Sequence, residues 1–116
     1  MHLDGSAAIG GEDKGPSPMQ AVLGAMGGCS SIDIVEILKK MRQPLEHIEV
    51  RIEGTRRDET PRIFTAAHLH FILTGDLKED KVKRAVDLSM DKYCSVVLML
   101  RDAVDVTSSY EIKNNH

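Results

Sequence analysis

The sequence has no tryptophan, few other aromatic residues and no excess of positive charge. Its 116 residues include two Phe and two Tyr, and 15 Lys and Arg stand against 18 Asp and Glu, for a formal net charge of −3. Proteins that bind nucleic acid ordinarily use basic residues to neutralise phosphates and aromatic rings to stack on bases. These shortages argue against a nucleic-acid partner.

Cysteine is also scarce, because the chain carries only Cys29 and Cys94. Two cysteines are too few for the disulfide framework of a small secreted domain, and they do not form the CxxC pairs of zinc sites. His68 and His70 share one face of a predicted strand, but no third ligand is indicated, so we expect a solvent-facing pair. Phosphate-binding, nucleophile-elbow and HExxH motifs are missing. We therefore expect neither a metal nor another cofactor.

Signals for export or membrane insertion are weak. The N-terminal residues lack the basic segment of a signal peptide. Residues 15–32 carry no charge, but Gly, Pro and Ser interrupt them, which makes a poor membrane span. We expect a cytoplasmic protein with no membrane partner, whose thiols stay free under reducing conditions.

The patterning predicts one domain over residues 1–116 that opens with an irregular arm over residues 1–16. A helix is expected to begin at Ser17, which serves as N-cap, with Pro18 at the first helical position and Gln20 completing a capping box. Helical composition continues to about Met41 and stops at Gln43 before a proline. The sequence thus predicts one long helix of more than twenty residues.

Shorter elements follow, and together they indicate an α+β fold. Alternating apolar residues predict strands over residues 46–53, 62–74 and 104–112, the first two as an antiparallel hairpin. Asp76 is expected to cap a helix over residues 77–91, and a short helix is expected from about Cys94 to Leu100. We therefore predict a small antiparallel sheet packed on one long buried helix and a shorter helix pair.

The first half of the long helix is apolar on every side, so it should be buried all round. Gly24, Gly27 and Gly28 each weaken a helix by about 1 kcal/mol relative to alanine, a cost that the close approach of another element would offset. A chain of 116 residues offers little surface to cover such a helix completely. We therefore expect a homodimer.

The residues themselves leave the role of the two thiols open. Cys29 lies in the apolar helix, where cysteine often packs as a small hydrophobic residue. Cys94 is expected at the start of a helix, where backbone N–H groups and the helix dipole lower the pKa of a thiol. Taken singly, each cysteine is best interpreted as a packing residue, and a dithiol site is the alternative.

The segments around both cysteines resemble a known family. Residues 15–33 (GPSPMQAVLGAMGGCSSID) are similar to the cysteine helix of the OsmC/Ohr family, the osmotically inducible protein C and organic hydroperoxide resistance proteins. Residues 93–96 (YCSV) resemble the family's second cysteine motif, at the expected distance downstream. The likeness covers about residues 10–112 and is greatest to the OsmC-like subgroup with a Gly-Gly-Cys helix.

The resemblance implies an OsmC-like fold, an intertwined homodimer and a reaction at the subunit interface. Cys29 would be the peroxidatic thiolate that reduces an organic hydroperoxide and becomes a sulfenic acid, and Cys94 the resolving thiol that condenses with it to a disulfide. A dithiol reductant would then restore both thiols. The pocket for this small hydrophobic or peroxide substrate is expected to be apolar, with a lining of Met19, Met26, Met90, Tyr93 and Met99.

Two departures from the family favour an alternative function. Met19 stands where the family has a Glu that orients an activating Arg, and the chain begins too late to contain the strands that supply this Arg. A thiolate in an apolar pocket without a cation has a raised pKa and reacts slowly. The alternative is a non-catalytic OsmC-like dimer that binds a small hydrophobic ligand in its interface pocket, so the sequence leaves open whether the protein is an enzyme.

Overall fold

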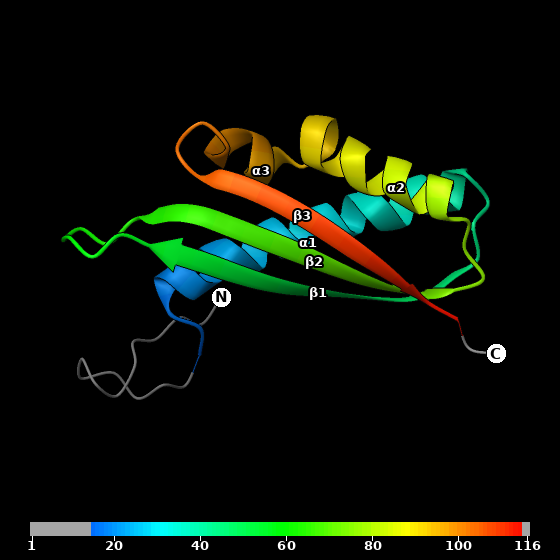
Figure 1. The fold of residues 1–116 in the computed structure, drawn as a ribbon, viewed down its shortest axis with the longest axis horizontal. Helices are drawn as coiled ribbons and strands as arrows, with labels where there is room; N and C mark the ends of the chain where they lie inside the picture. The colour runs from blue at the N-terminus through cyan, green and yellow to red at the C-terminus, as the bar shows by residue number, and fades with distance from the viewer. Residues whose placement is uncertain (1–14, 115–116) are drawn as a thin grey trace.

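The computed structural model of the chain describes residues 15–114, which form a three-stranded sheet with helices packed against it (Figure 1). The elements in chain order are α1 (Pro18–Lys40), β1 (Leu45–Arg56), β2 (Phe64–Gly75), α2 (Glu79–Leu88), the π-helical turn η2 (Ser89–Tyr93), α3 (Ser95–Leu100) and β3 (Asp105–Lys113). The predicted α+β class is confirmed. The predicted arm over residues 1–16 lies, apart from its last two residues, outside the described part of the chain.

Local sequence accounts for both ends of α1. The Ser17 hydroxyl accepts a hydrogen bond from the Gln20 N–H, and the Gln20 side chain accepts one from the Ser17 N–H at 2.8 Å, which completes the predicted capping box. At the other end Arg42 adopts a left-handed conformation with φ of 58°. The Gln43 N–H then bonds to the Leu38 carbonyl at 2.9 Å, so the helix closes in a Schellman motif.

The sheet is mixed, with strand order β1-β2-β3. β1 and β2 form the predicted antiparallel hairpin, with Val50 opposite Phe71. β3 pairs with β2 in parallel, so the expectation of a wholly antiparallel sheet is wrong. Between these two strands the chain returns through α2, η2 and α3 (Figure 1). This helical crossover brings β3 back to the end of the sheet at which β2 begins, and the two strands therefore run the same way.

The core lies between the helices and the inner face of the central strand β2. Alternate residues of β2 point inward, and those with no exposed surface are Leu69, Phe71 and Leu73. Against them α1 places Met26, Ile34 and Leu38, and α2 places Val82, Ala85 and Val86. α1 is also long and apolar enough to cross a membrane by length and composition. In this fold it packs on the sheet through its buried residues.

One face of α1 remains open in the single chain, so residues 15–114 alone do not provide the burial on every side that was expected together with a homodimer. Ile32 is 66% exposed and Val35 37% exposed. Gly24 and Gly28 lie on the same face, and a Cβ at either would meet nothing within 4 Å. Gly27 alone shows the expected close approach, because a Cβ there would collide with the Ile52 side chain of β1.

The segment between β2 and α3 departs from its prediction at two points. Asp76 does not cap α2, since the N-cap is Lys78, whose backbone N–H donates to the Gln43 side chain at 3.0 Å. α2 also ends earlier than expected, and the chain continues as the single π-turn η2. The Cys94 N–H closes this turn by bonding to the Ser89 carbonyl at 2.8 Å. Such turns recur at functional sites. Cys94 follows this turn directly and is buried in the core.

Candidate functional site

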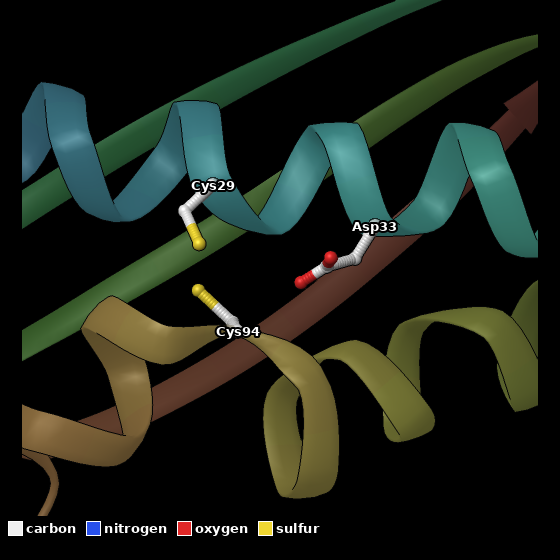
Figure 2. Close-up of side chains that lie close together, drawn as sticks. All are labelled: Cys29, Asp33 and Cys94. Carbon is white, nitrogen blue, oxygen red and sulfur yellow. The ribbon is translucent and has the colours of Figure 1, made fainter.

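A thiol and a carboxyl group of α1 meet a second thiol at the start of α3 (Figure 2). Cys29 and Asp33 are four residues apart in α1, so their side chains leave the same face of the helix one turn apart. Cys94 is the N-cap of α3. The two Sγ atoms and a carboxylate oxygen of Asp33 all lie within 4.8 Å of one another. The fold thus brings together two cysteines that are far apart in the sequence.

Cys94 has no exposed surface and is surrounded by the protein. The Ser30 hydroxyl lies 3.2 Å from the Cys94 Sγ and 2.8 Å from the Met26 carbonyl, and its single proton is donated to one or the other. Burial raises the pKa of Cys94 more than hydrogen bonds from Ser30 and from the backbone of Val97 lower it. The expectation of a lowered pKa at this helix start is therefore wrong, because desolvation outweighs the N-terminal donors.

Asp33 is half-buried beside the two thiols. Burial raises the pKa of its carboxyl group, and the Ser89 hydroxyl, 3.5 Å from Oδ2, opposes this shift. No Lys or Arg side chain of residues 15–114 contributes to the pKa shifts of Asp33 or Cys94. Burial is the largest cause of both shifts.

The methionines and tyrosine predicted to line a pocket occupy different environments. Met26 and Met90 are buried, and the Met90 Sδ lies 3.9 Å from the Ser30 hydroxyl oxygen. Met19 packs half-buried against the core, whereas Tyr93 is 56% and Met99 is 72% exposed. The two buried methionines thus both contact the serine beside Cys94, Met26 through its carbonyl and Met90 through its sulfur.

A groove of about 480 Å³ opens beside the site and extends along α1 and α2. Its lining residues are Asp33, Glu36, Ile37, Lys40, Met41, Arg84, Leu88 and Tyr93. Tyr93 is thus the one predicted pocket residue that lines this groove. The groove is lined by apolar side chains and by charges of both signs, and it shares Asp33 with the cysteine site.

His68 and His70 lie on the face of β2 opposite to the core. Both rings are hydrogen-bonded to β3, His68 to Thr107 and Ser109 at 2.7 and 2.8 Å, and His70 to Ser109 and Glu111 at 2.6 and 3.2 Å. The pair is half-buried rather than fully solvent-facing. These contacts tie β2 to β3 and stand apart from the cysteine site.

Sequence reasoning assigned no role to Asp33 or Ser30. The signal for Asp33 was its i, i+4 relation to Cys29, which places two side chains on one helix face. Ser30 follows Cys29 directly, yet its hydroxyl contacts Cys94 across the helix packing. No local pattern indicates that contact, because it depends on where η2 and α3 dock.

Alkylation is expected to distinguish the two thiols. Cys29 is half-buried, whereas Cys94 is fully buried and its pKa is raised by burial. Since the thiolate is the reactive form, iodoacetamide should modify Cys29 well before Cys94 in the reduced native protein. Peptide mass spectrometry over time measures the order, and unfolding in urea should make the two rates similar. Faster modification of Cys94 in the native protein would contradict the burial.

Comparisons with known proteins find relatives of this chain both in sequence and in fold. Residues 11–109 match the family model described as OsmC-like protein. The chain is 56% identical over 111 residues to Protein YhfA of Escherichia coli strain K12, covering 95% of this chain and 80% of that protein. A hypothetical protein from Aquifex aeolicus VF5 has 31% identity and a TM-score of 0.85, with both chains covered completely. An organic hydroperoxide resistance protein OsmC from Legionella pneumophila shares the fold at 21% identity, with a TM-score of 0.74 and coverage of 96% and 80%.

Proposed function

The chain belongs to the OsmC-like protein family, and from this premise we propose that it reduces organic hydroperoxides with the thiols of Cys29 and Cys94. The observation that carries the proposal is the approach of the two Sγ atoms to within 4.8 Å of each other. The two atoms come from α1 and from the start of α3, and both cysteines are free. Such a pair is placed to form a disulfide after one sulfur has been oxidised.

The different burial of the two thiols supports an order for the reaction. Cys29 is the more accessible, so its thiolate attacks the terminal peroxide oxygen, which breaks the O–O bond and gives the sulfenic acid. The alkoxide takes up the proton that the Cys29 thiol released on ionising and leaves as the alcohol. The Cys29 sulfenic acid then reacts with the Cys94 thiol, which forms the S–S bond and releases water. A dithiol reductant of the cytoplasm exchanges with this disulfide and returns both thiols. Burial of Cys94 suits the resolving role, because a buried thiol is protected from the peroxide itself.

The direct test follows peroxide and thiols together. The reduced protein is mixed with cumene hydroperoxide, and peroxide loss, free thiols and intact mass are measured. We expect one peroxide consumed for every two thiols lost, with a mass decrease of two hydrogens from an intramolecular disulfide. Peroxide loss no faster than with denatured protein, with both thiols still free, would end the proposal.

The open face of α1 supports a homodimer as the working form. Gly24, Gly28, Ile32 and Val35 present an apolar strip that the described part of the single chain leaves exposed. Small residues in such a strip let a second helix approach closely, and exposed apolar strips mark protein interfaces. The partner we propose is a second copy of this chain, placed so that each α1 covers the other.

Gly28→Lys is expected to shift the protein from dimer to monomer. The space around Gly28 is open in the single chain, so the lysine should leave the monomer fold intact while placing a charge in the apolar strip. Sedimentation velocity measures the mass, and Asp102→Lys, on an exposed turn after α3, is the control that should remain dimeric. A monomeric wild type, or a variant that stays dimeric, would contradict the proposed interface.

A second candidate function is non-catalytic binding of a small hydrophobic ligand. It is favoured by the groove beside Asp33 and by the lack, within residues 15–114, of a cation that lowers the pKa of Cys94. Cys29→Ser separates the two functions. Under the redox proposal the variant loses peroxide reduction, whereas under the binding proposal it retains the affinity of the wild type for an apolar fluorescent probe and the wild type itself consumes no peroxide.

A further inference from the structure

We propose that the reduced protein binds one zinc ion through Cys29, Asp33 and Cys94, with the fourth coordination position open. This site goes beyond the peroxide chemistry, because binding needs two thiols and a carboxylate but neither peroxide nor electron transfer. It also differs from the histidine pair on β2, whose rings are hydrogen-bonded to β3.

The geometry of the three side chains fits a tetrahedral zinc site. The ligand atoms lie within 4.8 Å of one another and point into the same space between α1 and α3 (Figure 2). With zinc–sulfur bonds of about 2.3 Å and tetrahedral angles, two sulfur ligands lie about 3.8 Å apart. The side chains therefore need only a small rotation to reach bonding distance. The i, i+4 spacing of Cys29 and Asp33 is also the spacing by which a helix presents two metal ligands in HExxH sites.

The charge balance of the site favours a cation. Two thiolates and a carboxylate would place three negative charges in one small space, where Cys94 is fully buried and Cys29 and Asp33 are half-buried. Such groups stay neutral by holding protons or are compensated by a bound metal ion, which deprotonates coordinating thiols. A set of two sulfur ligands and one oxygen ligand suits zinc better than magnesium or calcium, which prefer oxygen alone.

Two buried serines are placed to orient the ligands. The Ser30 hydroxyl lies 3.2 Å from the Cys94 Sγ, and the Ser89 hydroxyl lies 3.5 Å from the Asp33 Oδ2. Neither serine has exposed surface. Donors of this kind hold metal ligands in their binding orientation and stabilise the anionic form. With zinc bound, each serine would direct its proton to a ligand rather than to a backbone carbonyl.

Zinc at this site would regulate the redox reaction, a consequence that rests on the proposed function. Both sulfur atoms would be occupied by the metal, so a peroxide could not reach a free thiolate. Formation of the Cys29–Cys94 disulfide removes both sulfur ligands and would release the ion. The reduced protein would thus exist in a zinc-protected form and a metal-free, peroxide-reactive form.

Metal binding is tested on the reduced full-length chain without peroxide. Zinc affinity is measured by competition with a chromophoric chelator, and Co²⁺ serves as a spectroscopic probe of the ligands. We expect one ion per chain, with a thiolate-to-cobalt charge-transfer band and the visible bands of tetrahedral cobalt. Asp33→Asn should weaken zinc binding at least about tenfold, and Cys94→Ser should remove the charge-transfer intensity of one sulfur. Glu36→Gln, which removes a carboxylate one turn away in the groove, is the matched control and should bind as the wild type does.

The outcomes separate this proposal from the redox function. Lack of the charge-transfer band, unchanged zinc affinity in a folded Asp33→Asn variant, or equal affinity of the disulfide form would overturn the zinc site. Circular dichroism establishes that each variant is folded. A protein that fails to reduce peroxides but binds zinc with the expected dependence on Asp33 would refute the proposed reaction and leave this site standing.

Discussion

Replacing Cys29 with serine is expected to abolish hydroperoxide reduction. A serine hydroxyl is a far weaker nucleophile than a thiolate and forms no sulfenic acid, so the rate of peroxide loss should fall by more than about a hundredfold. The fold should be retained, because serine is similar in size to cysteine and Cys29 is only half-buried. Peroxide consumption with a dithiol reductant measures the effect, and Ser95→Ala, at an exposed position beside Cys94, is the control expected to keep full activity.

The companion variant Cys94→Ser should separate the two steps of the reaction. It keeps the proposed nucleophile, so one peroxide per chain is consumed and the Cys29 sulfenic acid accumulates without forming an intramolecular disulfide. A sulfenic-acid trapping reagent and intact-mass measurement detect this species. If Cys94→Ser fails to react while Cys29→Ser retains activity, the assigned roles of the two thiols are reversed.

Phe71→Ala is expected to have the largest effect on stability. Phe71 has no exposed surface. It lies on the inner face of β2, the middle strand of the sheet, and points towards the helices. Removing a buried aromatic ring leaves a cavity and costs about 3–5 kcal/mol. Single domains are stabilised by about 5–15 kcal/mol, so the variant should lose a large share of its free energy of unfolding. Urea denaturation at fixed protein concentration measures the loss.

Met99→Ala is the matched control for this prediction. Methionine is also a large apolar residue, but Met99 is 72% exposed, so its truncation should change the free energy of unfolding by no more than about 0.5 kcal/mol. Equal losses in the two variants would contradict the burial pattern, since the cost of truncation depends on the space that the neighbours leave empty.

The features that could be predicted from the sequence depend on interactions between residues that are near one another in the chain. The capping box at Ser17 and Gln20 involves residues three apart, and the inward-facing residues of β2 follow from strict alternation along one strand. The hairpin of β1 and β2 follows from two such strands joined by a short charged turn. The family likeness also rested on two contiguous segments, one around each cysteine, and the family was confirmed.

Features that depend on packing between distant segments could not be predicted from the sequence. Alternation is the same in a parallel and an antiparallel strand, so the direction of β3 depended on the helical crossover. The pKa of Cys94 rises because the core buries it, a property that a helix start does not reveal. Asp33 joins the thiols only after η2 and α3 dock on α1. Local sequence thus specified the elements and the two reactive residue types, whereas long-range packing set their burial, their charge environment and their meeting point, because desolvation and distance are properties of the folded chain.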